Sequence, residues 1–482
     1  MPDPHQRQNL PKKKWSRGPV RLRPSPYSKR EQWIIVSIVA LAGLFSPLPA
    51  NIFFPAIPQL AADFHRSTED INLTVTIYLV FQGISPMLWG PLGDRVGRRP
   101  IFLLCLVVLI GSSIGLALTP TSAYWLLMFL RCFQSGGSAS TIALGAGVIS
   151  DIADIREKGT LFGAFNVGPM LAPVIGPLIG GALSQHLGWR SIFWTLTIAS
   201  AACLMAILLF LPETMQLPYQ DDGRRCNILR RPVLPLIKSR SPETSEDEDR
   251  FSPKKASRNP FLPFTYPDVL VVLSFTSIIY AVNYSITATI SSSFQSTYPF
   301  LTETDLGLCY LPTGAGMLAG SVATGRILDW KYATYKTRAV EEQGDFPIEQ
   351  ARLSTMPIHL IVFVASVVGW AWSIQQKTSI AVPLVLQVIL GWTAMASLNT
   401  TMTLMIDIMP AQSSGITACV NFARCSLGAV LVSVIDMSTS AIGVGWTYVI
   451  LGGCSLALLP LFFVEMRFGP RWRVKRAHAL DI

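Results

Sequence analysis

Residues 101–119 read IFLLCLVVLIGSSIGLALT, a run of 19 residues without Asp, Glu, Lys or Arg. An α-helix rises about 1.5 Å per residue, so about 20 consecutive apolar residues are enough to cross the hydrocarbon core of a bilayer. The length and the uninterrupted apolar character of this segment therefore predict a membrane-spanning helix.

Similar apolar runs lie on both sides of this segment and bring the number of predicted spans to twelve. We expect them near 33–54, 73–91, 101–119, 123–149, 160–183, 189–211, 267–290, 306–327, 357–375, 380–405, 412–435 and 446–465. The sequence thus predicts an all-α membrane protein with two six-helix bundles, and a linker and two tails outside them. The proposed regions are a tail 1–32, a bundle 33–211, a linker 212–266, a bundle 267–465 and a tail 466–482.

The composition of the whole chain agrees with a membrane protein. Half of the 482 residues are hydrophobic and only 14% are Asp, Glu, Lys or Arg, against roughly 25% in soluble domains. The 39 Lys and Arg exceed the 29 Asp and Glu, which gives a net charge of +10. So low a density of charge excludes an ordinary soluble enzyme. The cysteines have no metal-ligand spacing, and no P-loop or HExxH motif occurs, so we expect no enzyme, metal or cofactor.

Most of the basic residues fall on one side of the predicted membrane. With the N-terminus inside, the inner segments hold 34 Lys and Arg, and the outer loops hold three, Arg66, Arg190 and Lys377. Short cytoplasmic loops carry such an excess. We therefore expect cytoplasmic termini and linker, with the plasma membrane as the location and the vacuolar membrane as the alternative. The basic tails then serve orientation and contact with anionic lipids, and no nucleic-acid partner is expected.

A short repeated sequence pattern, called the sequence echo below, suggests that the two bundles are copies of one unit. An Asp-Ile pair follows the fourth span and another follows the tenth, each with a glycine eight residues after the Asp and an asparagine further on. The matching residues are Asp151, Gly159 and Asn166 in the first half and Asp407, Gly415 and Asn421 in the second. Many transporters are built from repeats, with the substrate site at their interface.

Two arginines lie inside predicted spans. Arg131 falls in the fourth span, three residues before Gln134, and Arg424 falls about 20 Å into the eleventh at 1.5 Å per residue. A guanidinium in the membrane is costly, so it normally faces a cavity or a partner. The two arginines could face each other across a central cavity and bind an anion, since arginine pairs well with carboxylates. The alternative is that backbone carbonyls or local polar groups neutralise each of them.

Three further segments carry unusual patterns. Residues 90–99 read GPLGDRVGRR, a charge cluster at a membrane exit whose simplest interpretation is a basic turn. Residues 176–181 read GPLIGG, where small residues permit close helix packing. The first span contains Asn51 among several prolines, and no Asp, Glu or His lies deep in any predicted span.

These segments together resemble the major facilitator superfamily, over about residues 33–465. Residues 90–99 are similar to its motif A, Arg131 and Gln134 to its motif B, and GPLIGG to the antiporter motif C that is typical of exporters. The proline-rich first span strengthens a resemblance to the twelve-span drug:H+ antiporter family, including fungal multidrug and organic-acid exporters. The resemblance implies the major facilitator fold. It also implies a conformational latch of Gly90, Asp94, Arg95, Gly97, Arg98 and Asp151, closed against a helix start near Ala411, and an antiporter motif of Gly176, Pro177, Gly180 and Gly181.

The resemblance implies efflux of small molecules by alternating access, in a monomer, by proton-coupled antiport of drugs or metabolites. Bacterial relatives often carry an acid at the position of Asn51, which cannot titrate, so no proton carrier is evident. The alternative is export of an organic anion such as a citrate-like carboxylate, helped by the membrane potential. The candidate substrate-binding residues are Asn51, Arg131, Gln134 and Arg424. A non-transporting receptor or scaffold is a further class, although it would need none of these motifs.

Overall fold

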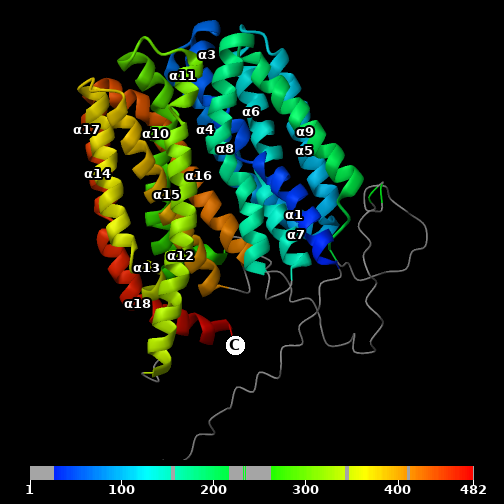
Figure 1. Cartoon of the computed structure of the whole chain (residues 1–482), viewed down its shortest axis with the longest axis vertical. Helices are drawn as coiled ribbons and strands as arrows, with labels where there is room; N and C mark the ends of the chain where they lie inside the picture. The colour runs from blue at the N-terminus through cyan, green and yellow to red at the C-terminus, as the bar shows by residue number, and fades with distance from the viewer. Residues whose placement is uncertain are drawn as a thin grey trace, which may run out of the picture.

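The computed structural model describes residues 27–153, 158–215, 232, 234, 262–341, 347–409 and 413–480. Over these ranges the regular elements are all helices (Figure 1). Most of the predicted tail 1–32 and of the predicted linker 212–266 lies outside the described residues.

Among the described residues, the first half contains nine α-helices and one 3-10 helix. They are α1 (Lys29–Leu44), α2 (Leu48–Asn51), η1 (Phe54–Ala56), α3 (Ile57–Asp63), α4 (Thr68–Val96), α5 (Arg98–Leu118), α6 (Tyr124–Ser138), α7 (Ser140–Ile152), α8 (Lys158–Leu187) and α9 (Arg190–Phe210). The described part of the second half follows the same order of spans. It consists of η3 (Leu262–Thr265), α10 (Pro267–Thr297), α11 (Glu303–Leu308), α12 (Leu311–Glu341), α13 (Ile348–Leu353), α14 (Met356–Gln375), α15 (Ala381–Ile408), α16 (Ser413–Ile442), α17 (Val444–Leu456) and α18 (Leu459–Leu480).

The predicted spans are all present as helices. Among the described residues, 11 helical stretches are long and apolar enough to cross a membrane. The remaining predicted span, 123–149, is the pair α6 and α7, which meet at Ala139. Ala139 keeps helical backbone angles, with φ −62° and ψ −31°, so the two helices follow one another as one span. The all-helical membrane fold is therefore confirmed.

The first span is broken where its prolines lie. Helix α1 ends at Leu44, Pro47 precedes the short helix α2, and Pro55 lies within the short helix η1. Proline lacks the N–H that continues a helix, which leaves carbonyl groups of the preceding turn without their usual donors. Non-helical backbone at membrane depth is tolerated where it is buried in protein. Phe53 and Phe54, at the centre of the break, are fully buried.

The two halves are packed by the same scheme. In the first half α1 packs on α8, α4 on α6, and α5 on α9. In the second half the corresponding spans meet: α10 packs on α16, α12 on α15, and α14 on α17. Figure 1 shows the two halves as separate bundles, with α1–α9 in blue to green and α10–α18 in green to red. The repeated scheme agrees with the sequence echo between the halves.

Helices α4 and α8 of the first bundle make the main contacts with the second. Helix α4 packs against α16, and α8 packs against α11 and α12. We call the side with the start of α1 and the end of α18 the terminal face, and the opposite side, where α3 and α11 lie, the far face (Figure 1). The α8–α11 contact lies at the far face, where the Thr304 N–H donates to Gln185 Oε1 at 3.0 Å.

Glycines in α8 make this packing possible. A Cβ atom on Gly180 would lie 2.0 Å from the carbonyl oxygen of Ile52, in the broken first span. A Cβ atom on Gly181 would lie 2.4 Å from the carbonyl oxygen of Glu303, at the start of α11. The two glycines therefore let one helix touch both the first span and the opposite bundle.

Replacing Gly180 tests this packing. Gly180→Ala forces a side chain into backbone and should cost about 1–3 kcal/mol through overpacking, which a melting curve of the purified protein would show as a lower Tm. Gly111→Ala is the matched control, because a Cβ atom at that helical glycine meets nothing within 4 Å. Equal melting temperatures for the two variants would contradict the proposed close contact.

Candidate functional site

Arg131 is fully buried and is bound to the broken first span. Its Nη1 donates to the carbonyl oxygen of Pro49 at 3.2 Å and to Gln134 Oε1 at 2.7 Å. Gln134 in turn donates through Nε2 to Ser113 Oγ at 3.2 Å. The break thus supplies a free carbonyl to the guanidinium, and the Arg-x-x-Gln spacing places the amide one helical turn away to orient it.

Aromatic rings enclose the same guanidinium. Its Cζ lies 4.1 Å from the centroid of the Phe53 ring and 4.8 Å from that of Tyr78, within the range of cation–π attraction. Nε and Nη2 are buried without a hydrogen-bond partner among the described residues. In this conformation Arg131 therefore stabilises the fold of the first bundle and keeps two unused donors.

Arg424 is held more loosely than Arg131. Its Nε and Nη2 donate to Asn421 Oδ1 at 3.2 and 2.9 Å, and its Cζ lies 4.9 Å from the Tyr280 ring centroid. The side chain is half-buried in α16. The Asn421 amide also donates through Nδ2 to the carbonyl oxygen of Gln82 in α4, at 2.8 Å. One asparagine therefore links the arginine of the second bundle to the backbone of the first.

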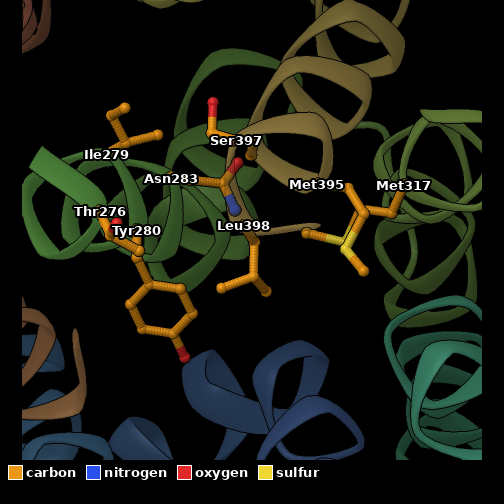
Figure 2. A pocket seen from close by; sticks show the side chains of 9 residues that line it. Thr276, Ile279, Tyr280, Asn283, Met317, Met395, Ser397 and Leu398 are labelled. Carbon is orange, nitrogen blue, oxygen red and sulfur yellow. The ribbon is translucent and has the colours of Figure 1, made fainter. Parts of the chain in front are cut away.

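A cavity of about 50 Å³ lies beside this arginine, between α10, α12 and α15. Its walls are Thr276, Ile279, Tyr280, Asn283, Met317, Ala394, Met395, Ser397 and Leu398. Figure 2 shows the Tyr280 hydroxyl directed away from this cavity toward helices of the first bundle, drawn in blue. Neither Arg131 nor Arg424 lines the cavity, and Tyr280 connects it to Arg424.

The residues of the predicted latch come together in the first bundle. Arg98 Nη1 lies 2.6 Å from Asp94 Oδ1, and its Nε lies 3.4 Å from Asp151 Oδ2. Gly97 has a φ of +125°, which few L residues adopt, and it makes the turn between α4 and α5. The predicted partner near Ala411 lies outside the described residues, and no contact of Arg95 is described.

Glu213 completes this cluster. Its two carboxylate oxygens accept the backbone N–H groups of Arg98 and Arg99 at 2.9 and 3.2 Å. These amides belong to the first turn of α5, where a negative charge is favourable because the helix dipole is positive there. A Cβ atom on Gly97 would lie 2.5 Å from Glu213 Oε2, so glycine is also needed for the approach of this carboxylate.

The second bundle carries a corresponding ion pair. Arg352 Nε lies 2.9 Å from Asp407 Oδ2. Asp407 holds the place in the sequence echo that Asp151 holds in the first half, and both acids end the fourth helical span of their bundle. The repeated acid therefore pairs with an arginine next to the third span in each half.

The residues of the predicted antiporter motif lie where α8 meets the first span and α11. A Cβ atom on Gly176 would lie 3.0 Å from Asn51 Cβ, and one on Gly307 would lie 2.5 Å from the carbonyl oxygen of Pro177. Asn51 itself donates through Nδ2 to the carbonyl oxygen of Pro47 at 2.7 Å. The same carbonyl also accepts the backbone N–H of Asn51 at 3.1 Å, so in this conformation both donors of Asn51 bind within the first span.

Sequence reasoning missed several charged and polar partners. Asn72 of α4 donates to Asp436 of α16 at 2.5 Å, and Asp268 pairs with Arg476 at the terminal face. Buried Glu349 lies 3.5 Å from Arg473 Nε. Each pair joins helices far apart in the chain, so no local spacing reveals it. Their only sequence signal is a charged residue near the end of an apolar run.

Two repeated bundles, an arginine within a span of each bundle and glycine-mediated contacts between the bundles are typical of a membrane transporter. The profile of the Major Facilitator Superfamily matches residues 39–433, and the chain belongs to this family.

Several fungal transporters are similar in sequence to this chain. Citrate exporter 1 of Aspergillus niger is 34% identical over 472 residues, covering 94% of this chain and 89% of its own. Multidrug transporter AQR1 of Candida glabrata is 32% identical, covering 94% of this chain and 79% of its own. MFS antiporter QDR2 of Candida albicans is also 32% identical, and the match covers 91% of this chain and 90% of that protein.

Solved structures confirm the fold. The human organic anion transporter MFSD10 has a TM-score of 0.57 at 15% identity, covering 89% of this chain and 99% of its own. A D-xylose–proton symporter has a TM-score of 0.65 at 14% identity, and the match covers 89% of this chain and 97% of the symporter chain. At such identities the likeness concerns the arrangement of helices alone.

The latch predicts energetic coupling between Asp94 and Arg98. Asp94→Asn and Arg98→Gln should each slow substrate exchange in proteoliposomes while substrate binding changes little, because the ion pair stabilises one conformation. The double variant should be no slower than either single variant, with a coupling of about 0.5–3 kcal/mol. Arg338→Gln removes an exposed charge from the terminal face and serves as the control. Additive effects of the two substitutions would contradict the latch.

Proposed function

We propose that this transporter exports small organic anions, and that its terminal face is cytoplasmic. The excess of Lys and Arg in the segments of this face supports the orientation. In the plasma membrane, an inside-negative potential favours the exit of an anion by about 2.3 kcal/mol per charge per 100 mV. The antiporter motif and the similarity to a citrate exporter support the outward direction.

Arg424 is the residue that favours an anionic substrate. It is a half-buried guanidinium, beside a cavity, whose described hydrogen bonds all go to one neutral amide oxygen. No carboxylate of the described residues forms an ion pair with it. A substrate carboxylate offers two oxygens to the guanidinium and a full negative charge, so it competes well with the amide. Arg131 is already enclosed and bound to the first span.

Substrate binding at Arg424 would weaken the contact between the bundles. Asn421 uses its oxygen for Arg424 and its N–H for the Gln82 carbonyl of α4. A substrate carboxylate that binds the Arg424 guanidinium would replace the Asn421 oxygen there. Asn421 would then no longer be held at both of its ends, by Arg424 and by the Gln82 carbonyl. We infer that this exchange couples binding to separation of α4 from α16, which alternating access requires.

Proton-coupled antiport of drug-like compounds is the second candidate function. Met317, Met395 and Leu398 give the cavity an adaptable apolar wall, which suits compounds of varied shape. Similarity to a multidrug transporter and to an MFS antiporter supports the same function. The two candidates differ in charge selectivity and in the driving gradient.

Substitutions of the two arginines should have different effects. Arg424→Gln should abolish exchange of radiolabelled citrate in proteoliposomes at an unchanged protein yield, and Arg424→Lys should keep part of it. Arg131→Gln should lower the melting temperature by removing a buried charge from its carbonyl and aromatic partners. Full citrate exchange by Arg424→Gln would contradict the anion site, and an unchanged melting temperature of Arg131→Gln would contradict the anchoring role.

The driving gradient can be tested in the same vesicles. For a potential-driven anion exporter, collapsing the pH gradient at a clamped membrane potential, with the pH on the far-face side held constant, should leave citrate transport unchanged, and collapsing the potential should slow it. The opposite result, slow transport only after loss of the pH gradient, would favour proton antiport. Arg424→Gln vesicles give the background of passive leak.

A further inference from the structure

A second, polar pocket lies at the far face, away from the two arginines. It has a volume of about 370 Å³ and lies where α4, α10, α16 and α17 meet. Hydroxyl groups and two carboxylates dominate its wall, which consists of Ser67, Thr68, Glu69, Thr289, Ser292, Ser293, Ser296, Asp436, Thr439, Ser440 and Val444. Glu69, Ser296 and Ser440 are exposed, so the pocket communicates with the far side.

One bond in this pocket joins the two bundles. Asn72 of α4 donates through Nδ2 to Asp436 Oδ2 of α16 at 2.5 Å. Asn72 is 1% exposed, and its Oδ1 is buried without a hydrogen-bond partner among the described residues. The amide is therefore bonded to the carboxylate through its nitrogen, and its oxygen is an acceptor without a donor among the described residues. An unsatisfied buried acceptor costs about 1–3 kcal/mol.

The charges around Asp436 are negative or neutral. From α4, Glu69 lies within electrostatic range of it, and from α17 so does Tyr448, whose hydroxyl is hydrogen-bonded to Thr289 at 3.0 Å. The wall residues from α10 are Thr289 and three serines. No Lys, Arg or His is among the residues that line this pocket. The carboxylate at the bundle contact therefore has no cationic side chain in its pocket.

We propose that Asp436 is an external proton site that closes the far face of the transporter. A proton on Asp436 supplies the missing donor: its O–H bonds to Asn72 Oδ1 while its other oxygen keeps the bond from Nδ2. The pair then has two hydrogen bonds across the bundle contact instead of one. The proposal rests on the alternating access of the proposed function.

The sign of the effect follows from this geometry. Protonation strengthens the α4–α16 contact at the far face, so acid outside stabilises the conformation that is closed on that side. At higher external pH the pair loses one bond and the far face opens more readily. Because the pocket communicates with the far side, the proton exchanges with that side and is sensed there.

Distance measurements between the bundles test the proposal. Spin labels on Leu118→Cys and Phe300→Cys, exposed positions at the far ends of the two bundles, report opening by pulsed electron resonance in nanodiscs. The native cysteines are replaced by serine. Raising the pH from about 4, near the ordinary pKa of an aspartate, to about 8 should shift the distances toward longer values. Unchanged distances would overturn the proposal.

Two variants test whether Asp436 is the residue that binds the proton. Asp436→Asn introduces an amide that can form both hydrogen bonds with Asn72 at any pH, so it should keep the short distances throughout and lose the pH-dependent shift. Glu69→Gln, in the same pocket, is the matched control and should keep the shift. A retained shift in Asp436→Asn, or a loss of the shift in Glu69→Gln, would overturn the assignment to Asp436.

Citrate counterflow in proteoliposomes separates this proposal from the proposed function. Wild-type counterflow without a pH-dependent distance change would retain the anion exporter and overturn the proton site. A pH-dependent change that needs Asp436, in a protein that does not exchange citrate, would support the proton site and contradict citrate as the substrate.

Discussion

A charged or polar group inside a membrane must find a partner in the protein, and this constraint organises the first bundle. The prolines of the first span interrupt its helix and leave the carbonyl of Pro49 free. Arg131 of α6 binds that carbonyl, and Asn51 binds the carbonyl of Pro47. The break and the arginine therefore stabilise each other, since each would be costly alone. Glycines of α8 then allow the broken span to pack closely.

The second bundle uses its arginine differently. Arg424 is held by Asn421, which also binds the backbone of α4 in the opposite bundle. At the far face, Asn72 and Asp436 join the same two helices, and Gln185 and Thr304 join α8 to α11. These bonds are few and depend on small polar side chains. A contact of this kind can break and reform with substrate or protons, whereas the buried apolar core within each bundle stays intact.

The sequence was sufficient for the helices and for part of the site. Apolar runs predict the spans because lipid requires about 20 apolar residues in succession, and the intramembrane position of Arg131 and Arg424 already indicates a partner or a cavity. The partners themselves are not predictable from spacing. Asn72 and Asp436 are separated by 364 positions in the chain, and the Pro49 carbonyl becomes an acceptor only because the helix breaks there. Asn421 can bond to Arg424 and to the Gln82 carbonyl at the same time only because α4 and α16 pack together, which the sequence does not show.

Comparison of metabolites tests the central claim of anion export most directly. Cells that make the wild-type transporter are compared with cells that make equal amounts of Arg424→Gln, by untargeted analysis of the medium and of the cell contents. The account predicts that one or more small carboxylates are enriched in the medium and depleted in the cells only with the wild-type chain. Identical profiles, or enrichment of cationic or neutral compounds alone, would contradict it.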